Sequence, residues 1–325
     1  MNTAVLIANP AASQFTGGLH RKVSRALTKN HLLETAWPQN AEDARRIAAE
    51  AVSRGVSLIV AMGGDGIVHH VAQAVVDTPA TLGIIPTGTT NVIARIHQIP
   101  KTPQLAAKLL AVDYDTRTIP TICVRAETAE GTLERHALFS MGIGLDAEVV
   151  SIAELEPHRK LRFGWFHYAG TTLKVLWKDL RKRKREFEVS CDLFRREAIG
   201  LLVQCHPVYT YFGRIPLTID QEPPDPMSAL VIERLPFRRA ARFLSAARNG
   251  HLEKLQDIDL VKNCHELEAT SIKRPQNIQC DGELINGVER LVAEYRPLSI
   301  RLAVPSPESV KQRLWSPRRL FPKGS

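Results

Sequence analysis

The glycine-rich segment Gly63–Gly66, which reads Gly-Gly-Asp-Gly, is the part of this chain best suited to bind an anion. It follows the apolar run Val56–Met62, which is typical of a strand buried on both faces of a sheet. Beyond it, apolar residues recur with helical spacing as far as Val76. A glycine turn lets the backbone approach a ligand, and the free N–H groups at a helix start attract phosphate. Asp65 adds a carboxylate, which suggests a bound divalent cation and phosphoryl transfer; a simple helix cap is the alternative.

Two further strands are expected to end in small polar loops. Thr3–Ala8 precedes the loop Asn9–Ser13, and Thr81–Pro86 precedes the loop Thr87–Asn91. The intervening helix-like or strand-like segments are Gly17–Asn30, Leu33–Trp37 and Asn40–Ser53. This alternation of strands and helices predicts a parallel sheet with right-handed crossovers. The polar loops would then meet beyond the carboxyl ends of the strands, where ligands bind in such sheets.

Five motifs, in chain order, match one known family. They are Asn9–Ser13, Gly63–Gly66, Pro86–Arg95, Phe139–Ala147 and the tripeptide Asp281-Gly282-Glu283. Together they resemble the diacylglycerol kinase catalytic-domain family, which includes sphingosine kinases and bacterial soluble lipid kinases. The resemblance runs from about residue 3 to about residue 304. Gly-Gly-Asp-Gly alone also occurs in NAD kinases, so the combination carries the resemblance.

The resemblance implies a two-domain fold. The expected N-terminal α/β domain, residues 1–120, is a doubly wound parallel sheet like that of NAD kinases and binds the nucleotide. Residues 121–304 would form a β-rich lipid-substrate domain, and residues 305–325 would return to the first domain. Closely spaced strand patterns after Arg117 independently predict an antiparallel β-sandwich. The predicted strands are Ile119–Ala126, Leu133–Met141, Phe187–Phe194, Ile199–Cys205, Ala229–Glu233, Asp257–Val261, Glu266–Ala269, Asn277–Cys280, Arg290–Tyr295 and Leu298–Val304.

Phosphoryl transfer requires a held nucleotide, neutralised phosphate charge and a deprotonated acceptor hydroxyl. The resemblance places the deprotonating carboxylate in Asp281-Gly282-Glu283, and we assign Glu283 as general base and Asp281 to a metal–water network. On extended backbone the two carboxylates would share one face; a surface Asp-Gly turn is the alternative. Asp65 would be the acidic group near the phosphates. The predicted nucleotide-binding residues are Asn9, Pro10, Ser13, Gly63, Gly64, Asp65, Gly66, Thr87, Gly88, Thr89 and Asn91.

The chain departs from the family pattern at several positions. Ile67, His69 and His70 replace a threonine and an Asn-Glu pair that commonly follow the glycines, and Val92 stands where aspartate is frequent. Adjacent histidines on a helix point apart, so a metal pair is not expected there. Asp225 keeps the acidic residue of a turn that supports a structural Mg²⁺ in relatives, but the glycine is missing, so Asp225 is a weak metal candidate. These changes leave room for an altered nucleotide preference or for a weak or inactive kinase.

Length and composition fit this interpretation. A chain of 325 residues suits two domains, and 44% hydrophobic and 24% charged residues are ordinary for a globular protein. No apolar stretch is long enough to span a bilayer, and the N-terminus lacks the features of a signal peptide. Five cysteines without metal-like spacing suggest reduced thiols in a cytosol.

Basic residues account for a formal net charge of +9 and concentrate in the runs His158–Arg162 and Arg181–Arg185. Between them, Trp165–Leu180 carries aromatic and aliphatic residues, as an interfacial helix would; a core-packing helix with a solvated charged end is the alternative. The run Lys311–Arg319 could add to a basic surface. Anionic headgroups attract such segments, whereas no recognised nucleic-acid-binding motif is present.

The resemblance thus implies a cytoplasmic, peripherally membrane-associated lipid kinase that transfers the γ-phosphoryl group of ATP, with Mg²⁺, to a lipid hydroxyl. The acceptor stays open among diacylglycerol, a sphingoid base, phosphatidylglycerol and an isoprenoid lipid, and so does the oligomeric state. One alternative is an NAD kinase-like enzyme, which would not need Asn9-Pro10, Gly88-Thr89-Thr90-Asn91 or the basic segment. The other is a catalytically inactive lipid- or nucleotide-binding protein, for which Ile67, His69, His70 and Val92 would argue.

Overall fold

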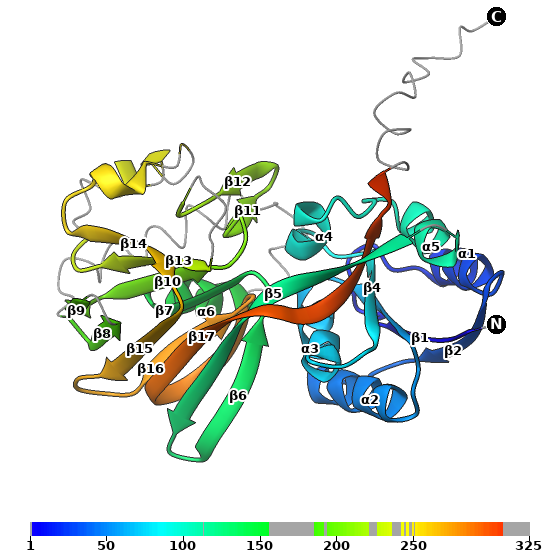
Figure 1. Ribbon diagram of the computed structural model, residues 1–325, viewed down its shortest axis with the longest axis horizontal. Helices are drawn as coiled ribbons and strands as arrows, with labels where there is room; N and C mark the ends of the chain where they lie inside the picture. Colours follow the sequence, from blue (N-terminus) through cyan, green and yellow to red (C-terminus); the bar gives the residue numbers. More distant parts are fainter. Residues whose placement is uncertain are drawn as a thin grey trace, which may run out of the picture.

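The computed structural model describes residues 2–112, 114–155, 185–191, 194–220, 226–235 and 251–307, with residues 242, 243, 245, 246 and 249. An N-terminal α/β domain and a strand-rich C-terminal domain lie side by side, and two long strands run through both (Figure 1). In the described ranges, no helix is both long enough and apolar enough to cross a membrane.

The N-terminal domain is built on four parallel strands in the order β2-β1-β3-β4, which confirms the predicted parallel sheet. Its elements are β1 (Asn2–Ala8), α1 (Gly17–Leu27), β2 (His31–Ala36), α2 (Ala41–Ser53), β3 (Leu58–Gly63), α3 (Asp65–Val75), β4 (Thr81–Pro86), α4 (Val92–Ile96) and α5 (Pro103–Val112). Every residue of β3 and β4 is buried, as their uninterrupted apolar sequences require. Helix α1 packs on α5 and α2 packs on α3, and the two pairs cover opposite faces of the sheet (Figure 1). The domain is therefore doubly wound, as predicted.

The C-terminal domain consists mainly of antiparallel strands. Its elements are β5 (Tyr114–Thr128), β6 (Gly131–Ala137), β7 (Ser140–Gly144), α6 (Leu145–Leu155), β8 (Phe187–Cys191), β9 (Phe194–Ala198), β10 (Gly200–Gln204), β11 (Thr210–Phe212), β12 (Ile215–Leu217), β13 (Met227–Ile232), the 3-10 helix η1 (Leu252–Lys254), β14 (Ile258–Cys264), β15 (Glu266–Ser271), β16 (Gln276–Cys280) and β17 (Glu283–Pro305). One layer, β14-β13-β10-β7-β16, and a second, which contains β5, β8, β15 and β17, bury their inner side chains in one core. This two-layer arrangement agrees with the predicted sandwich.

Strands β5 and β17 join the domains. They pair antiparallel along most of their length, and the end of β17 also pairs parallel with β4 at Arg301 and Leu302. The two predicted strands Arg290–Tyr295 and Leu298–Val304 are therefore wrong as separate elements: they form one strand with an irregular register between Arg296 and Ile300. A continuous partner, β5, spans the interruption.

The predicted strand Leu133–Met141 is also wrong, because β6 ends at Ala137 and β7 begins at Ser140. The backbone N–H groups of Leu138, Phe139 and Ser140 all donate to the carboxylate of Asp281. A side chain thus replaces ladder hydrogen bonds at this point, and the strand breaks there.

Candidate active site

The three polar loops of the N-terminal domain converge at the carboxyl edge of its sheet. The backbone N–H of Asn9 donates to Met62 O in β3 (2.9 Å), and the N–H of Thr87 donates to Gly63 O (2.8 Å). The hydroxyl groups of Ser13 and Thr89 lie 3.4 Å apart. The structure therefore brings together the loops after β1, β3 and β4, which hold the predicted nucleotide-binding residues.

Contact between Gly64 and Gly88 sets the spacing of the second and third loops. A Cβ atom added to Gly88 would overlap the Cα of Gly64, so only glycine allows this approach. Asn91 closes the third loop, because its Oδ1 accepts from Gly88 N–H (3.2 Å) and its Nδ2 donates to Gly88 O (2.8 Å). Asn91 itself has a φ of 52°, a left-handed conformation that asparagine tolerates. Its side chain therefore shapes the loop, while Thr89 is exposed at the surface.

Asp65 is the first residue of α3 and links the second and third loops. Its Oδ1 accepts from Val92 N–H at 2.6 Å. Burial raises the pKa of Asp65 to about 6, and the nearby Asp281 carboxylate adds to this shift, while the hydrogen bond from Val92 opposes it. A partly buried acid beside a second acid is a place where a cation would relieve unfavourable charge.

Asp281 and Gly282 form the two-residue turn between β16 and β17, with φ values of 56° and 90°. The expectation of extended backbone across this tripeptide is therefore wrong. The alternative of an Asp-Gly turn is confirmed: Gly282 is exposed, whereas Asp281 is buried, with only 6% of its surface exposed. An Asp-Gly pair with two left-handed residues is the favoured hairpin turn, since it matches the twist of the strands.

The Asp281 carboxylate is occupied by protein donors. Oδ2 accepts from His69 Nδ1 (2.8 Å) and Leu138 N (2.7 Å), and Oδ1 accepts from Phe139 N (3.0 Å) and Ser140 N (3.3 Å). Two donors on each oxygen leave little capacity for direct coordination of a metal. The arrangement instead anchors the turn, and with it Glu283, to α3 and to the segment between β6 and β7.

Glu283, the first residue of β17, faces the start of α3. Its Oε1 lies 2.5 Å from the position that a Cβ atom on Gly66 would take, so the missing side chain of Gly66 makes room for the carboxylate. Its Oε2 accepts from His70 Nε2 at 3.2 Å. The Glu283 side chain is 37% exposed, which leaves it accessible to an acceptor molecule. The structure thus brings Glu283 and Asp281 to the glycine turn that carries Asp65.

In the sequence, His69 and His70 stand out only as departures from the family pattern. They are the residues that contact the two carboxylates, and both rings turn toward the tripeptide, with centroids 5.2 Å apart. The signal available in the sequence was the coincidence of two unusual histidines with a motif rich in acids. The sequence does not indicate which residues pair, because His69 is 212 residues from Asp281 and His70 is 213 residues from Glu283.

A buried polar network, which the sequence analysis also missed, supports the turn from the other side. Gln279 Oε1 accepts from Gly282 N–H (2.7 Å), and Gln279 Nε2 donates to Asp146 Oδ2 (2.7 Å). The Tyr209 hydroxyl donates to the same oxygen of Asp146 (2.6 Å). Burial raises the pKa of Asp146, and these two donors oppose the shift. The Asp146 side chain fills the space beside Gly142, which explains that glycine in the Phe139–Ala147 motif.

A basic pocket of about 200 Å³ lies next to the third loop. Its lining comes from the third loop, from α4 and the segment after it, from the β11–β12 hairpin and from the segment between β1 and α1: Gln14, Pro86, Thr89, Thr90, Asn91, Ala94, Arg95, Ile99, Lys101, Gly213 and Arg214. Arg95 stacks on the ring of Tyr211, 3.4 Å from its centroid, and donates to Gly213 O at 2.8 Å. Arg95, Lys101 and Arg214 make the pocket attractive to an anion.

Several predicted features lie outside the described residues. These are the metal candidate Asp225, the basic runs except Arg185, the aromatic segment between them and the C-terminal run from Lys311. Arg185 donates to Glu233 at 2.6 Å.

Residues 3–124 match a family model described as the diacylglycerol kinase catalytic domain. A diacylglycerol kinase of Mycobacterium tuberculosis is 43% identical over 81 residues, which are 25% of this chain and 26% of that protein. A diacylglycerol kinase of Bacillus subtilis is 36% identical over 123 residues, or 37% of this chain and 41% of that protein. A Pseudomonas putida protein named "Probable lipid kinase YegS-like" is 46% identical over 83 residues, which cover 25% of this chain and 28% of that one. The chain therefore matches well under half the length of these relatives.

The fold likeness extends much further. A crystal structure of a diacylglycerol kinase from Bacillus anthracis superposes with a TM-score of 0.63 at 19% identity. The superposition covers 95% of this chain and 98% of that one. At this identity the likeness establishes the architecture of both domains.

Proposed function

We propose that the protein is an ATP-dependent lipid kinase, because its residues 3–124 match the family model of the diacylglycerol kinase catalytic domain. It transfers the γ-phosphoryl group of ATP to the hydroxyl of a diacylglycerol-like or sphingoid-like lipid. Relatives named as diacylglycerol kinases and lipid kinases support the reaction class.

One observation carries the proposal: the Glu283 carboxylate lies against Gly66, at the start of α3. In the proposed complex the phosphates approach the N–H groups of this glycine turn, as anions do at helix starts. A partly exposed carboxylate beside the transferring phosphoryl group is where the acceptor hydroxyl must be deprotonated. His70 donates to the same carboxylate and restricts its orientation.

The nucleotide would lie along the converged loops. Its phosphates would contact Gly63–Gly66, and the basic pocket with Arg95 would hold a further part of it. The exposed hydroxyls of Ser13 and Thr89 offer hydrogen bonds from the first and third loops. Gly88 and Asn91 would shape the third loop, because the Asn91 side chain is already hydrogen-bonded to the backbone of Gly88.

Mg²⁺ is the proposed cofactor. Bound at the glycine turn, it would neutralise the negative charge of the phosphates. The carboxylate of Asp65 fits this role, because it lies partly buried at the turn, where desolvation and the nearby Asp281 carboxylate raise its pKa. Asp281 does not fit as a direct ligand, since both its oxygens accept from protein donors. Asp65 and the nucleotide phosphates together match the usual Mg²⁺ environment of one or two carboxylates with substrate oxygens.

We further propose that the protein works in the cytoplasm at the surface of an anionic membrane. The net charge of +9 supports this, because each basic residue near such a surface contributes about 1 kcal/mol of attraction.

The test is transfer of labelled γ-phosphate from ATP, with Mg²⁺, to a panel of diacylglycerol, a sphingoid base, phosphatidylglycerol and an isoprenoid alcohol, with NAD as the non-lipid acceptor. Labelling of one of the lipids supports the proposal. Labelling of NAD alone would favour an NAD kinase-like enzyme. ATP binding without labelling of any acceptor would favour a binding protein.

A further inference from the structure

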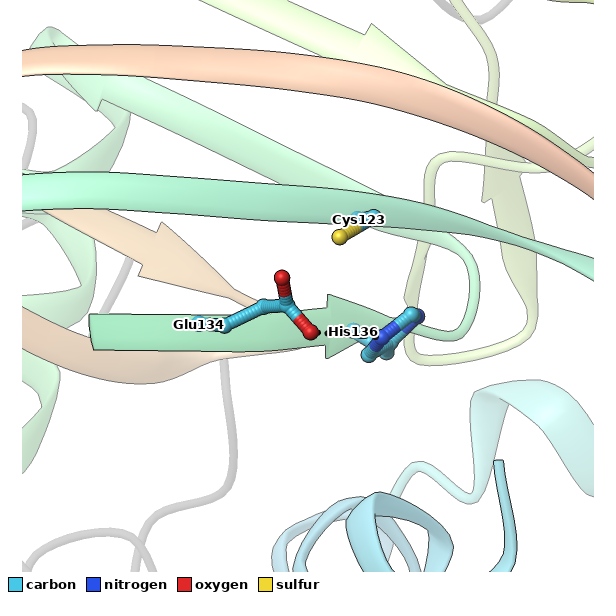
Figure 2. Close-up of side chains that lie close together, drawn as sticks. All are labelled: Cys123, Glu134 and His136. Carbon is cyan, nitrogen blue, oxygen red and sulfur yellow. Dashed lines mark ion pairs between the residues drawn. The ribbon is translucent and has the colours of Figure 1, made fainter. Parts of the chain in front are cut away.

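The hairpin of β5 and β6 carries three potential metal ligands on one face. Cys123 and His136 are directly opposed across the ladder, and Glu134 precedes His136 by two residues on the same strand. Residues two apart on a strand project from the same face, so the thiol, imidazole and carboxylate must meet. Figure 2 shows the three side chains close together on the neighbouring strands.

The spacing of their ligand atoms suits a single ion. One ligand atom from each residue lies within 4.8 Å of the other two, and His136 Nε2 lies 3.6 Å from Glu134 Oε1. Ligands at the corners of a Zn²⁺ tetrahedron stand about 3.3–3.6 Å apart when its usual bond lengths are used. We propose that Cys123, Glu134 and His136 form a binding site for Zn²⁺ or a similar transition-metal ion. The site is independent of the proposed kinase chemistry.

The surroundings of His136 favour this arrangement. Its Nδ1 lies 3.1 Å from the Oγ1 of the fully buried Thr121. When Nδ1–H donates to that hydroxyl, Nε2 carries the free lone pair and faces Glu134. Metal-bound histidines almost always have their other nitrogen held by such a hydrogen bond, which fixes the ring and its tautomer.

The ligand chemistry selects the type of ion. A thiolate and an imidazole favour Zn²⁺, Co²⁺ or Ni²⁺ and discriminate against Mg²⁺, which prefers oxygen ligands. When a cation binds, the Cys123 thiol loses its proton to solvent and coordinates the ion as a thiolate.

Two guanidinium groups lie near the site, and one acid offsets part of their positive charge. Glu294 lies opposite Cys123 on β17 and pairs with Arg125 (3.2 Å) and Arg296 (3.3 Å). The Glu134 side chain is 54% exposed, which gives an ion a path of entry and leaves room for water in a fourth position.

The site is tied to the helix that carries Asp65. The side chain of Gln73, on α3, forms hydrogen bonds with both backbone polar groups of His136. His136 N–H donates to Gln73 Oε1, and Gln73 Nε2 donates to His136 O, each at 2.8 Å. A metal that fixes His136 therefore also holds the hairpin against α3, across the boundary between the domains. We expect metal binding to raise the melting temperature of the whole protein, because an ion that binds only the folded state stabilises it.

Co²⁺ titration of the full chain provides the test, because a cysteine ligand produces thiolate-to-cobalt absorption in the near ultraviolet. We expect that absorption at one Co²⁺ per chain, its loss on addition of Zn²⁺ and no competition from Mg²⁺. Cys123→Ser should abolish the absorption, whereas Cys191→Ser, which changes a thiol on β8, should leave it unchanged. Absorption that survives Cys123→Ser, or that is lost in Cys191→Ser, would overturn the assignment.

Glu134→Gln provides a variant at an exposed position, where the fold should survive even if Cys123→Ser unfolds. It should weaken Zn²⁺ binding strongly and remove the Zn²⁺-induced rise in melting temperature. Glu130→Gln removes the same charge from the turn of the same hairpin and should change neither. Thr121→Val should weaken binding by about 10–100-fold, the usual effect of removing a supporting hydrogen bond. Equal Zn²⁺ affinity in wild type and Glu134→Gln would contradict the proposal.

Discussion

Acidification should destabilise this protein through two buried histidines that meet between the domains. His97 follows α4 and His206 follows β10, and their rings pack edge to face with centroids 5.1 Å apart. The Nε2 atom of each is buried and has no hydrogen-bond partner in the described part of the chain. Burial lowers the pKa of His97 to about 3 and that of His206 to about 4.

The magnitude follows from proton linkage. Between the folded pKa values and the ordinary value of 6.5, the unfolded chain binds protons at His97 and His206 that the folded protein does not. Stability therefore rises with pH across this window and falls on acidification. At about pH 5 the pH lies about 1.5 units below the pKa of a histidine in the unfolded chain. At about 1.4 kcal/mol per unit, each histidine then lowers the free energy of unfolding by about 2 kcal/mol. Together the two histidines would lower the free energy of unfolding by up to about 4 kcal/mol, where about 5–15 kcal/mol is typical of a folded protein.

Asp65 has the opposite effect on stability. Because its pKa is raised, the folded protein binds more protons than the unfolded chain between about pH 4 and 6, so this residue stabilises the fold on acidification.

A variant with both His97→Phe and His206→Phe isolates the histidine contribution and keeps the aromatic contact. Urea denaturation of both proteins at about pH 7 and about pH 5 measures the difference. Wild type should lose about 4 kcal/mol more than the double variant. Equal losses in the two proteins would refute the reasoning.

Three other changes test single contacts. Gly88→Ala should force Gly64 away, lower stability by about 1–3 kcal/mol and weaken ATP binding, as denaturation and calorimetry can measure; unchanged values would contradict the loop packing. Gln279→Leu leaves Asp146 with one donor fewer, so the unfolding free energy should fall by about 1–3 kcal/mol and lipid turnover should fall while ATP affinity holds. Arg95→Ala should weaken ATP binding more at low than at high ionic strength; an effect independent of salt would argue against an anion in the basic pocket.

The N-terminal domain could be predicted because its signals are local. The apolar runs of β3 and β4, the glycines between strand and helix and the periodicity of α3 each lie within about a dozen residues. Parallel strands then place their carboxyl-end loops together without any knowledge of long-range contacts.

The details around Glu283 could not be predicted, because contacts between distant segments decide them. The break between β6 and β7 depends on the carboxylate of Asp281, and the roles of His69 and His70 depend on side chains more than 200 residues away. The Asp281-Gly282 turn is the exception, because its dipeptide is a strong local hairpin signal that predicts the observed turn rather than extended backbone.

The most direct test of the account is the rate of phosphoryl transfer by Glu283→Gln. This change keeps the size of the side chain and its capacity to accept from His70, but it removes the negative charge. With the lipid that wild type phosphorylates, single-turnover transfer should slow by about 10²–10⁴-fold, the usual contribution of a general base, while ATP affinity stays near that of wild type. Glu130→Gln, an exposed change on the β5–β6 turn, should transfer at the wild-type rate. Equal rates in wild type and Glu283→Gln would contradict the account and move the base elsewhere, with Asp65 as the next candidate.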